Sequence, residues 1–303
     1  MLNIVGKKNW YFLISFLIII PGIISMCLWG LRLSIDFTGG SRIILLFDKA
    51  VNQQTENRVK DSFKEEKIEI VTIQPSDKSL IIRTKPINEK QDANLLKRLK
   101  SKVGSVKQEE FETIGPSIGS EITMNALKAI LLASVLIVLY IAYSFRTVPK
   151  PTSSWRFGIC AVIALVHDAL VLVGIFSLLG HFAGVEVDSL FITALLTVIG
   201  FSVHDTIVVF DRIRENLRRT IDLPFPQIVN DSILQTLVRS LNTSLTAILV
   251  LFTLLIFGGS TIHWFIIALL IGIASGTYSS IFNAAPLLVA WHELDERRKK
   301  KNS

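Results

Sequence analysis

The apolar residues of this chain are gathered in six long blocks instead of being spread evenly. Blocks of this length can cross the roughly 30 Å hydrocarbon core of a bilayer as helices. The expected spans are 10–30, 124–145, 156–179, 188–210, 236–257 and 262–290. The sixth block is longer than one crossing needs, so we expect it to tilt, kink at Pro286 or protrude. The pattern predicts an α-helical polytopic membrane protein with six transmembrane helices.

A polar stretch, residues 31–123, separates the first two spans. Its pattern predicts a strand, helix, strand, strand, helix and strand at 41–47, 52–66, 67–73, 79–84, 89–103 and 106–114. In the second strand we expect Ile68, Ile70 and Thr72 on one face and Val71 and Ile73 on the other. Pro75, Ser76 and Asp77 are the expected turn that follows. The order βαββαβ predicts a small α+β, ferredoxin-like domain, whose helices cover one face of an antiparallel sheet.

Basic residues gather at one set of span ends. These are Lys7, Lys8, Arg146, Lys150, Arg156, Arg212, Arg214, Arg218, Arg219 and the run from Arg297 to Lys301. The opposite short loops, 180–187 and 258–261, carry no Lys or Arg. The positive-inside rule therefore predicts that both termini are cytoplasmic and that the polar domain lies outside. The expected organisation is a cytoplasmic N-terminus and first span (1–30), a periplasmic domain (31–123), a five-span bundle (124–291) and a basic cytoplasmic tail (292–303).

Composition supports a membrane protein: half of the residues are hydrophobic and the mean hydropathy is +0.50. The net charge of +7 does not indicate nucleic-acid binding, because many of the Lys and Arg residues flank spans. Cys27 and Cys160 both fall inside apolar blocks, which argues against a disulfide or a metal site. The first block is longer than a signal-peptide core and no A-x-A site follows it, so we expect a retained anchor. Met26 is too bulky for the lipoprotein cleavage site that residues 24–27 loosely suggest.

Ionisable side chains inside a span are costly and usually line a pathway or pair with each other. Asp205 in the fourth span and Arg239 in the fifth lie at similar depths on consecutive helices. We expect them to form a pair in which Asp205 takes up a proton when Arg239 moves away. A static ion pair that fixes helix packing is the alternative.

Three further ionisable residues are weaker candidates for proton transfer. His167 and Asp168 are adjacent, and neighbours in a helix do not share a face, so we expect them to have different partners. His204 precedes Asp205, and each of these side chains could instead hydrogen-bond a neighbouring helix.

Two stripes suggest helix contacts. Asn242, Thr243 and Thr246 continue from Arg239 at helical spacing and predict a wet groove or inter-helix hydrogen bonds. In the sixth span small residues recur every four positions, which predicts close packing on a helix of this chain or another. They are Ala268, Gly272, Gly276, Ser280 and Ala284.

No pattern points to an enzyme. The sequence offers no nucleophile-plus-base motif, and the pair Gly39-Gly40 lacks the Lys-Ser/Thr of a phosphate-binding loop. We expect no ATP hydrolysis, no metal and no cofactor.

Four segments together resemble the SecF family, within the resistance-nodulation-division (RND) superfamily. Asp36-Phe37-Thr38-Gly39-Gly40 resembles the D-F-x-G-G signature, and Gly115-Pro116-Ser117-Ile118-Gly119 resembles the G-P-x-x-G stretch before the second span. Val166-His167-Asp168 is similar to the third-span motif. The stretch from Thr193 to Asn216 is similar to the fourth-span signature and is the most specific of the four.

The resemblance implies half of an RND-type fold and a role that the residues alone could not indicate. The family pairs with SecD, and the pair joins the SecYEG channel, with YajC and YidC as further neighbours. It uses the proton-motive force to draw an unfolded exported polypeptide out after SecA has pushed it. In the family, residues matching Asp205 and Arg239 are implicated in proton conduction. His204 stands where Asn is common, so the proton affinity of Asp205 cannot be carried over.

The resemblance thus implies a bacterial inner-membrane subunit of protein export that works with a separate SecD. Two other functions stay open. One is small-molecule efflux of the RND type, although such pumps usually carry both six-span halves in one chain. The other is an assembly scaffold in which the charged residues hold helices together and no proton moves.

Overall fold

Six helices in the part of the chain that the computed structural model describes are long and apolar enough to cross a membrane. The structure describes residues 2–76, 78–149, 152–219 and 223–302. The predicted Asp77 turn residue and the flanking Lys150 lie outside this description. The spanning helices are α1 (Lys8–Trp29), α5 (Pro116–Ser144), α6 (Ser154–Ala183), α7 (Ser189–Arg219), α8 (Phe225–Phe257) and α9 (Ser260–Ser279). The prediction of six spans is confirmed.

The sixth span contains a π-helical turn. After α9 the chain continues through η2 (Ser280–Ala284) into α10 (Ala285–Asn302), in which Pro286 is the second residue. Proline has no backbone N–H and collides with the carbonyl of an ordinary α-helical turn, so a wider turn just before it relieves both problems. The predicted irregularity at Pro286 is therefore a π-helical segment that ends two residues before it.

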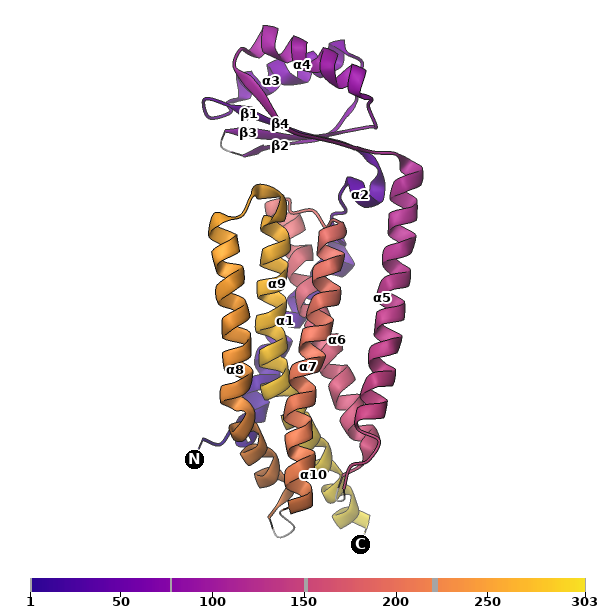
Figure 1. Ribbon diagram of the computed structural model, residues 1–303, viewed down its shortest axis with the longest axis vertical. Coiled ribbons are helices and arrows are strands. Elements are labelled where there is room, and N and C mark those ends of the chain that lie inside the picture. The colour runs from indigo at the N-terminus through magenta and orange to yellow at the C-terminus, as the bar shows by residue number, and fades with distance from the viewer. Residues whose placement is uncertain (1, 77, 150–151, 220–222, 303) are drawn as a thin grey trace. The chain divides into compact units, whose positions relative to one another are not determined.

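Figure 1 shows the helices running side by side, with both chain ends at the same end of the bundle. Half of the most apolar window of α6 and of α7 is buried, and 56% of that of the α9–α10 span, but only 6% for α5 and 11% for α8. The inner helices are thus α6, α7 and α9. A polar side chain on their inner faces must find its partners within the bundle.

Helices α1 and α6 are parallel and pack in register. Gly22 lies against Gly174, the Ser25 and Ser177 hydroxyls are 2.7 Å apart, and Trp29 stacks on His181 at 3.8 Å. Each pair is separated by 152 residues. A β-carbon on Gly174 would lie 2.7 Å from the Gly22 α-carbon, so only glycine fits. Close approach at small residues is a common way for helices to associate in a membrane.

The polar stretch folds into a sheet unit that clusters separately from the bundle and consists of residues Arg32–Lys128 and Glu186–Ser189. Its elements are α2 (Ile35–Thr38), β1 (Gly40–Phe47), α3 (Gln53–Glu65), β2 (Ile70–Ser76), β3 (Ser79–Thr84), α4 (Glu89–Val103) and β4 (Val106–Ile114). The strand order is β2-β3-β1-β4 and every neighbouring pair is antiparallel. The ferredoxin-like prediction is confirmed.

Helices α3 and α4 cover one face of the sheet (Figure 1). Phe63 of α3 and Leu95 of α4 are buried against Leu45 and Ile82 of the central strands. Apolar side chains at helical spacing on α3 and α4 and at every second position on β1 and β3 build this core.

Strand β2 departs from the predicted alternation. A bulge between Ile70 and Thr72 shifts its register, so Ile70 and Ile73 both pack on the core while Val71 is exposed. The predicted turn residues Pro75 and Ser76 are paired within β2. Proline is tolerated there because β2 is an edge strand, whose outward N–H groups need no ladder partner.

Candidate functional site

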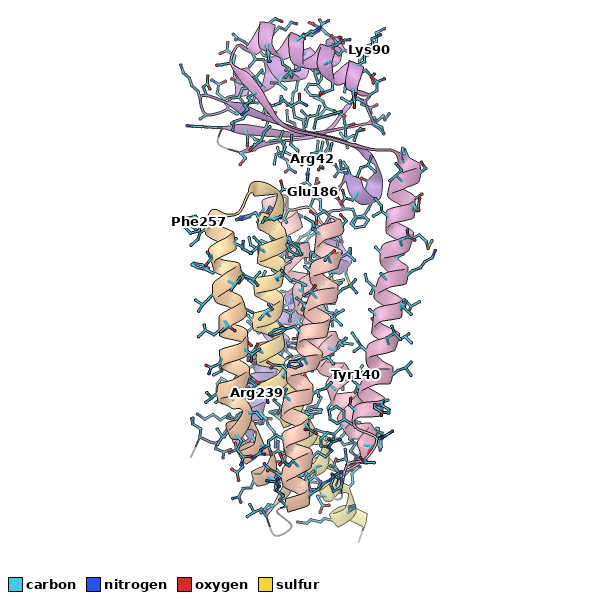
Figure 2. The ribbon with its side chains drawn as sticks, viewed as in Figure 1. Arg42, Lys90, Tyr140, Glu186, Arg239 and Phe257 are labelled. Atoms are coloured by element: carbon cyan, nitrogen blue, oxygen red, sulfur yellow. The ribbon has the colours of Figure 1, made fainter. Side chains whose placement is uncertain are left out.

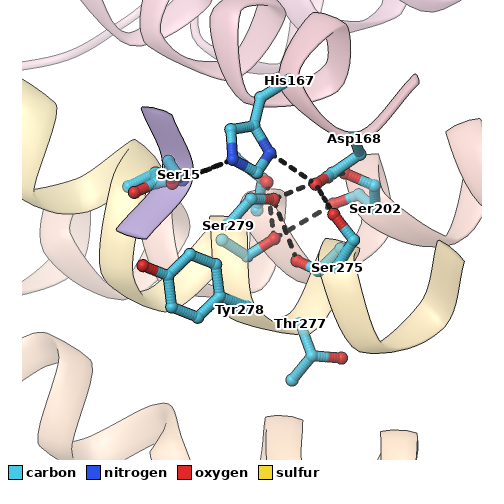
Figure 3. Close-up of polar contacts among 12 residues, drawn as sticks. Ser15, His167, Asp168, Ser202, Ser275, Thr277, Tyr278 and Ser279 are labelled. Atoms are coloured by element: carbon cyan, nitrogen blue, oxygen red, sulfur yellow. Dashed lines mark hydrogen bonds and ion pairs between the residues drawn. The ribbon is translucent and has the colours of Figure 1, made fainter. Parts of the chain in front are cut away.

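Asp168 is the centre of a polar network inside the helix bundle (Figure 3). It is fully buried on α6. Its Oδ2 accepts hydrogen bonds from Ser202 of α7 at 2.5 Å and from Ser279 of α9 at 2.6 Å. Its Oδ1 accepts from Ser275 of α9 at 2.7 Å and faces Nδ1 of His167 at 3.0 Å. Two donors on each oxygen satisfy an ionised carboxylate, which would otherwise be costly to bury.

His167 connects this carboxylate to α1 and to the π-helical turn. Its Nε2 lies 2.9 Å from Oγ of Ser15 and 3.1 Å from Nδ2 of Asn283. An amide N–H can only donate, so Nε2 accepts and Nδ1 carries the proton that faces Asp168. His167 and Asp168 have different partners on the other helices, as expected, but the imidazole also bends back onto its neighbour.

The small residues of the sixth span lie against α7. A β-carbon on Gly272 would meet the Val198 side chain at 2.0 Å, and one on Gly276 would lie 3.1 Å from the β-carbon of Ser202. One turn further, the hydroxyls of Ser280 and Thr206 are 2.8 Å apart. These contacts repeat every four residues on both helices. The absence of side chains on α9 lets α7 come close enough for Ser202 to reach Asp168.

Asp205 is buried on α7, with 2% of its surface exposed. It interacts with the Ser240 hydroxyl of α8, but short of full hydrogen-bond geometry, so Asp205 Oδ2 and Ser240 Oγ both lack a partner among the described residues. His204, next to it, is exposed. A buried carboxyl with an unpartnered oxygen is costly as an anion, so this site favours exchange of a proton over permanent charge.

The expected ion pair between Asp205 and Arg239 is not made in the described structure. Arg239 is exposed on α8, where Figure 2 labels it, as are Asn242, Thr243 and Thr246. The face of α8 that points inward carries Ser240 and Ser244 instead. Asp205 and Arg239 do lie on consecutive helices, as predicted. The rotation of α8, however, turns Ser240, the residue after Arg239, toward α7.

Hydroxyl groups extend the network across the bundle. Ser244 of α8 lies 2.5 Å from Thr277 of α9, and Asn283 also donates to Ser15 at 2.7 Å. We call the whole set the polar belt. It consists of Ser15, His167, Asp168, Ser202, Asp205, Thr206, Ser240, Ser244, Ser275, Thr277, Ser279, Ser280 and Asn283.

Sequence reasoning singled out four residues of the polar belt and missed the other nine. The four are His167, Asp168, Asp205 and Ser280. Most of the missed residues are Ser or Thr, which hydropathy barely distinguishes from their apolar neighbours. A signal was present in three pairs spaced four apart: Ser202 with Thr206, Ser240 with Ser244, and Ser275 with Ser279. Such spacing puts both hydroxyls of a pair on one helix face. The described residues contain no group of His, Cys, Asp and Glu that could hold a metal ion.

A second constellation lies in the sheet unit, where residues 186–189 join the segment before β1. Val187 N donates to the Arg32 carbonyl at 2.7 Å, and Ser34 N donates to the Val187 carbonyl at 2.8 Å. Asp36 Oδ2 accepts from Ser189 N, the first residue of α7, at 2.8 Å. An acidic side chain at this point caps the helix and complements its dipole. The Asp of the D-F-x-G-G segment is thus bonded to Ser189 within the sheet unit.

The glycines of the two predicted motifs meet each other. Gly39 and Gly40 have φ values of 71° and 122°, which favour glycine. A β-carbon on Gly119 would lie 3.0 Å from the Gly39 nitrogen and 3.1 Å from the Phe37 carbonyl oxygen. The segments 36–40 and 115–119 therefore pack backbone against backbone, which explains why both are rich in glycine.

Charged side chains cover the face of the sheet that the helices leave open. Glu186 bonds Arg83 at 2.9 Å, and Arg83 also donates to the Leu33 carbonyl at 3.0 Å (Figure 2 labels Glu186). Arg42 pairs with Glu110 at 2.7 Å and with Glu112 at 2.9 Å. Partial burial raises the pKa of the Glu112 carboxyl, against the opposing effect of Arg42. The Glu186–Arg83 contact fastens residues 186–189 to β3.

Comparison with known proteins agrees with these motifs. The family described as "Protein export membrane protein SecD/SecF, C-terminal" matches residues 94–294, and the SecD/SecF GG motif matches residues 30–51. The chain is 49% identical to "Protein translocase subunit SecF" of Thermobaculum terrenum, over 97% of this chain and 95% of that protein. It is 42% identical to the protein of the same name from Anaerolinea thermophila, over 96% and 94% of the two chains.

Longer proteins also match. The chain is 37% identical to "Protein translocase subunit SecDF" of Thermus thermophilus, over 86% of this chain and 35% of that protein. A crystal structure of SecDF, titled a translocon-associated membrane protein, superposes with a TM-score of 0.82 and 34% identity. The match covers 96% of this chain and 39% of that one, so this chain spans about two fifths of the solved SecDF. The chain therefore belongs to the SecD/SecF family of protein export membrane proteins and groups with the SecF subunits.

Proposed function

We propose that this chain is the SecF subunit of a Sec protein translocase and that, with SecD, it uses the proton-motive force to promote late stages of export through SecYEG. Membership of the SecD/SecF family supports the translocase role. Its relatives are named as translocase subunits and not as enzymes. The observation that supports proton coupling is the buried Asp205, whose Oδ2 has no hydrogen-bond partner among the described residues.

In this proposal Asp205 takes up and releases the proton. A neutral carboxyl suits the present surroundings of Asp205. Among the described residues of α8, Ser240 is the one with which Asp205 has a polar contact. An approach of Arg239 would favour the anion and release the proton. Because Arg239 faces outward here, that approach requires α8 to rotate or a second protein to redirect the guanidinium. His204, which is exposed, exchanges protons with the surroundings and modulates Asp205.

SecD is the expected partner, since the matching SecDF proteins carry both parts in one chain. The outer face of α8 supports a polar neighbour: Arg239, Asn242, Thr243 and Thr246 are all exposed inside a spanning helix. A guanidinium facing lipid costs several kcal/mol, about 2.5–3.5 on insertion scales, so a partner helix is the better neighbour. SecYEG, with YajC, YidC and SecA, and the unfolded exported chain complete the proposed assembly.

The proposed location is the bacterial inner membrane with both termini in the cytoplasm. The basic side chains that set this orientation lie near the ends of the bundle helices, where Lys8 pairs with Glu293 at 2.5 Å. The sheet unit would then be periplasmic and would move with the pump. The proton gradient would be the energy source, with no cofactor.

Proton flux tests the proposal. The chain is reconstituted with its SecD partner and a stalled export substrate in liposomes, a pH gradient is imposed, and wild type is compared with Asp205→Asn and Arg239→Ala. We expect flux in wild type and its loss in both variants. Equal flux in all three, with folding and SecD binding intact, would contradict proton coupling through this pair and favour the scaffold role.

A further inference from the structure

We propose that Asp168 is a positioning residue for Asp205: through Ser202, its carboxylate sets the rotation of α7 that directs Asp205 at α8. The inference rests on the proposed function for its importance, since Asp205 is the proposed proton carrier. It assigns to Asp168 a role different from proton transfer.

Two hydrogen bonds fix the rotation of α7. Ser202 and Thr206 flank Asp205 and lie on one face, where Ser202 donates to Asp168 and Thr206 bonds Ser280. Residues three and four apart share a helix face, so fixing Ser202 and Thr206 fixes the direction of the residue between them. Asp205 interacts with Ser240 of α8, and no hydrogen bond joins it to Asp168 among the described residues.

Asp168 is surrounded by hydrogen-bond donors. Four donors converge on it from α6, α7 and α9, and each of its oxygens has two of them. A proton on either oxygen would have to displace one donor, whereas the anion satisfies all four. The cluster therefore satisfies the carboxylate and ties three helices together. Asp205, with an unpartnered oxygen, is built in the opposite way.

Helices α7 and α9 pack closely beside Asp168. A β-carbon on Gly276 would lie 3.1 Å from the Ser202 β-carbon and 3.7 Å from Asp168 Oδ2, so α7 and α9 are tightly packed where Ser202 reaches Asp168. The titratable group that interacts with Asp205 among the described residues is His204 on its own helix; Arg239 of α8 is exposed, and Tyr278 of α9 donates to the Tyr11 carbonyl. Next to Asp168 the titratable neighbour is His167.

Carbodiimide labelling tests the inference on the complete chain in detergent or liposomes. Dicyclohexylcarbodiimide is apolar and couples to protonated carboxyl groups, and mass spectrometry of peptides reports the labelled residue. We expect wild type to be labelled at Asp205, with an extent that falls as the pH rises, and to stay unlabelled at Asp168. Labelling of Asp168 as readily as Asp205 would overturn the inference.

Two matched variants isolate the role of α7. Ser202→Ala and Ser275→Ala each remove one hydroxyl from Asp168, but only Ser202 belongs to the helix that carries Asp205. We expect Ser202→Ala to shift the pH midpoint of Asp205 labelling by about half a unit or more, and Ser275→Ala and the same-helix control Thr197→Ala to leave it unchanged. Among the described residues, the Thr197 hydroxyl donates to the Thr193 carbonyl of its own helix. An unshifted midpoint in Ser202→Ala, or equal shifts in Ser202→Ala and Ser275→Ala, would overturn the positioning role.

The outcome of the labelling experiment does not depend on whether the proposed function is correct. Labelling needs neither SecD nor a pH gradient, so it remains decisive if the reconstituted protein conducts no protons. Conversely, flux that depends on Asp205 would stand even if Ser202→Ala left the labelling of Asp205 untouched.

Discussion

Gly22 of α1 and Gly174 of α6 meet backbone against backbone, so that a β-carbon on either would lie within 3 Å of the other's α-carbon. The same register sets Ser15 beside His167 and Ser25 beside Ser177. The glycine contact therefore determines whether α1 can complete the polar belt.

Replacement of Gly174 by alanine should separate α1 from α6. The clash is with backbone, which cannot move aside as a side chain can, so we expect a loss of about 1–3 kcal/mol in stability. Thermal unfolding in detergent measures it. Gly200→Ala on α7 is the control, because a β-carbon there meets nothing within 4 Å. Equal melting temperatures for Gly174→Ala and Gly200→Ala would contradict the packing.

Replacement of Gly272 by alanine should be rescued by a second substitution. The new β-carbon would collide with the Val198 side chain at 2.0 Å, and Val198→Ala removes the two nearest colliding atoms, Cγ1 and Cγ2. We expect Gly272→Ala to destabilise the bundle by about 1–3 kcal/mol and the double variant to be more stable than the sum of the single effects predicts. Simple additivity in thermal unfolding would show that α9 does not pack on α7 at this point.

Glu186→Ala should loosen the start of α7. The variant removes the partner of Arg83, whose side chain is only 12% exposed, so we expect a loss of about 1–3 kcal/mol. Hydrogen exchange of residues 186–192 should become faster. Glu69→Ala is the control, because its pair with Lys85 is largely exposed and such pairs contribute little. Unchanged exchange in Glu186→Ala would exclude the role of this contact in holding residues 186–189 on the sheet.

Acid should weaken the contact between α3 and α4. Hydrogen bonds from Lys102 and Arg98 lower the pKa of Glu65 below its ordinary value of 4.5. The folded state therefore binds this proton less tightly than the unfolded state does. Its stabilisation is complete above the unfolded pKa and is lost as the pH falls through the folded pKa.

The Glu65 prediction is checked by unfolding the full chain at a series of pH values. Glu65→Gln should reduce stability at neutral pH and should flatten the decline of stability in acid relative to wild type. Glu109→Gln, at an exposed position on β4, is the matched control and should follow wild type. A Glu65→Gln curve parallel to that of wild type down to the acid limit would refute the linkage.

The sequence by itself determined the number of spans, the presence of the sheet unit and the order of its strands and helices along the chain. Apolar blocks near 20 residues have one stable arrangement in a membrane, and the alternation of β1 and β3 matches a sheet covered on one side. These signals are local, so they survive without knowledge of neighbours. Strand β2 shows their limit, since its bulge moved Ile73 to the core and left Val71 exposed.

The tertiary structure alone decided which polar side chains meet. The helix that carries a residue and its depth along that helix follow from counting residues. Counting correctly put Asp205 and Arg239 on consecutive helices. The rotation of each helix does not follow from counting, because it depends on where small residues such as Gly276 let another helix approach. That rotation turned Arg239 outward and gathered three serines from two other helices around Asp168, a cluster whose members lie up to 111 residues apart in the chain.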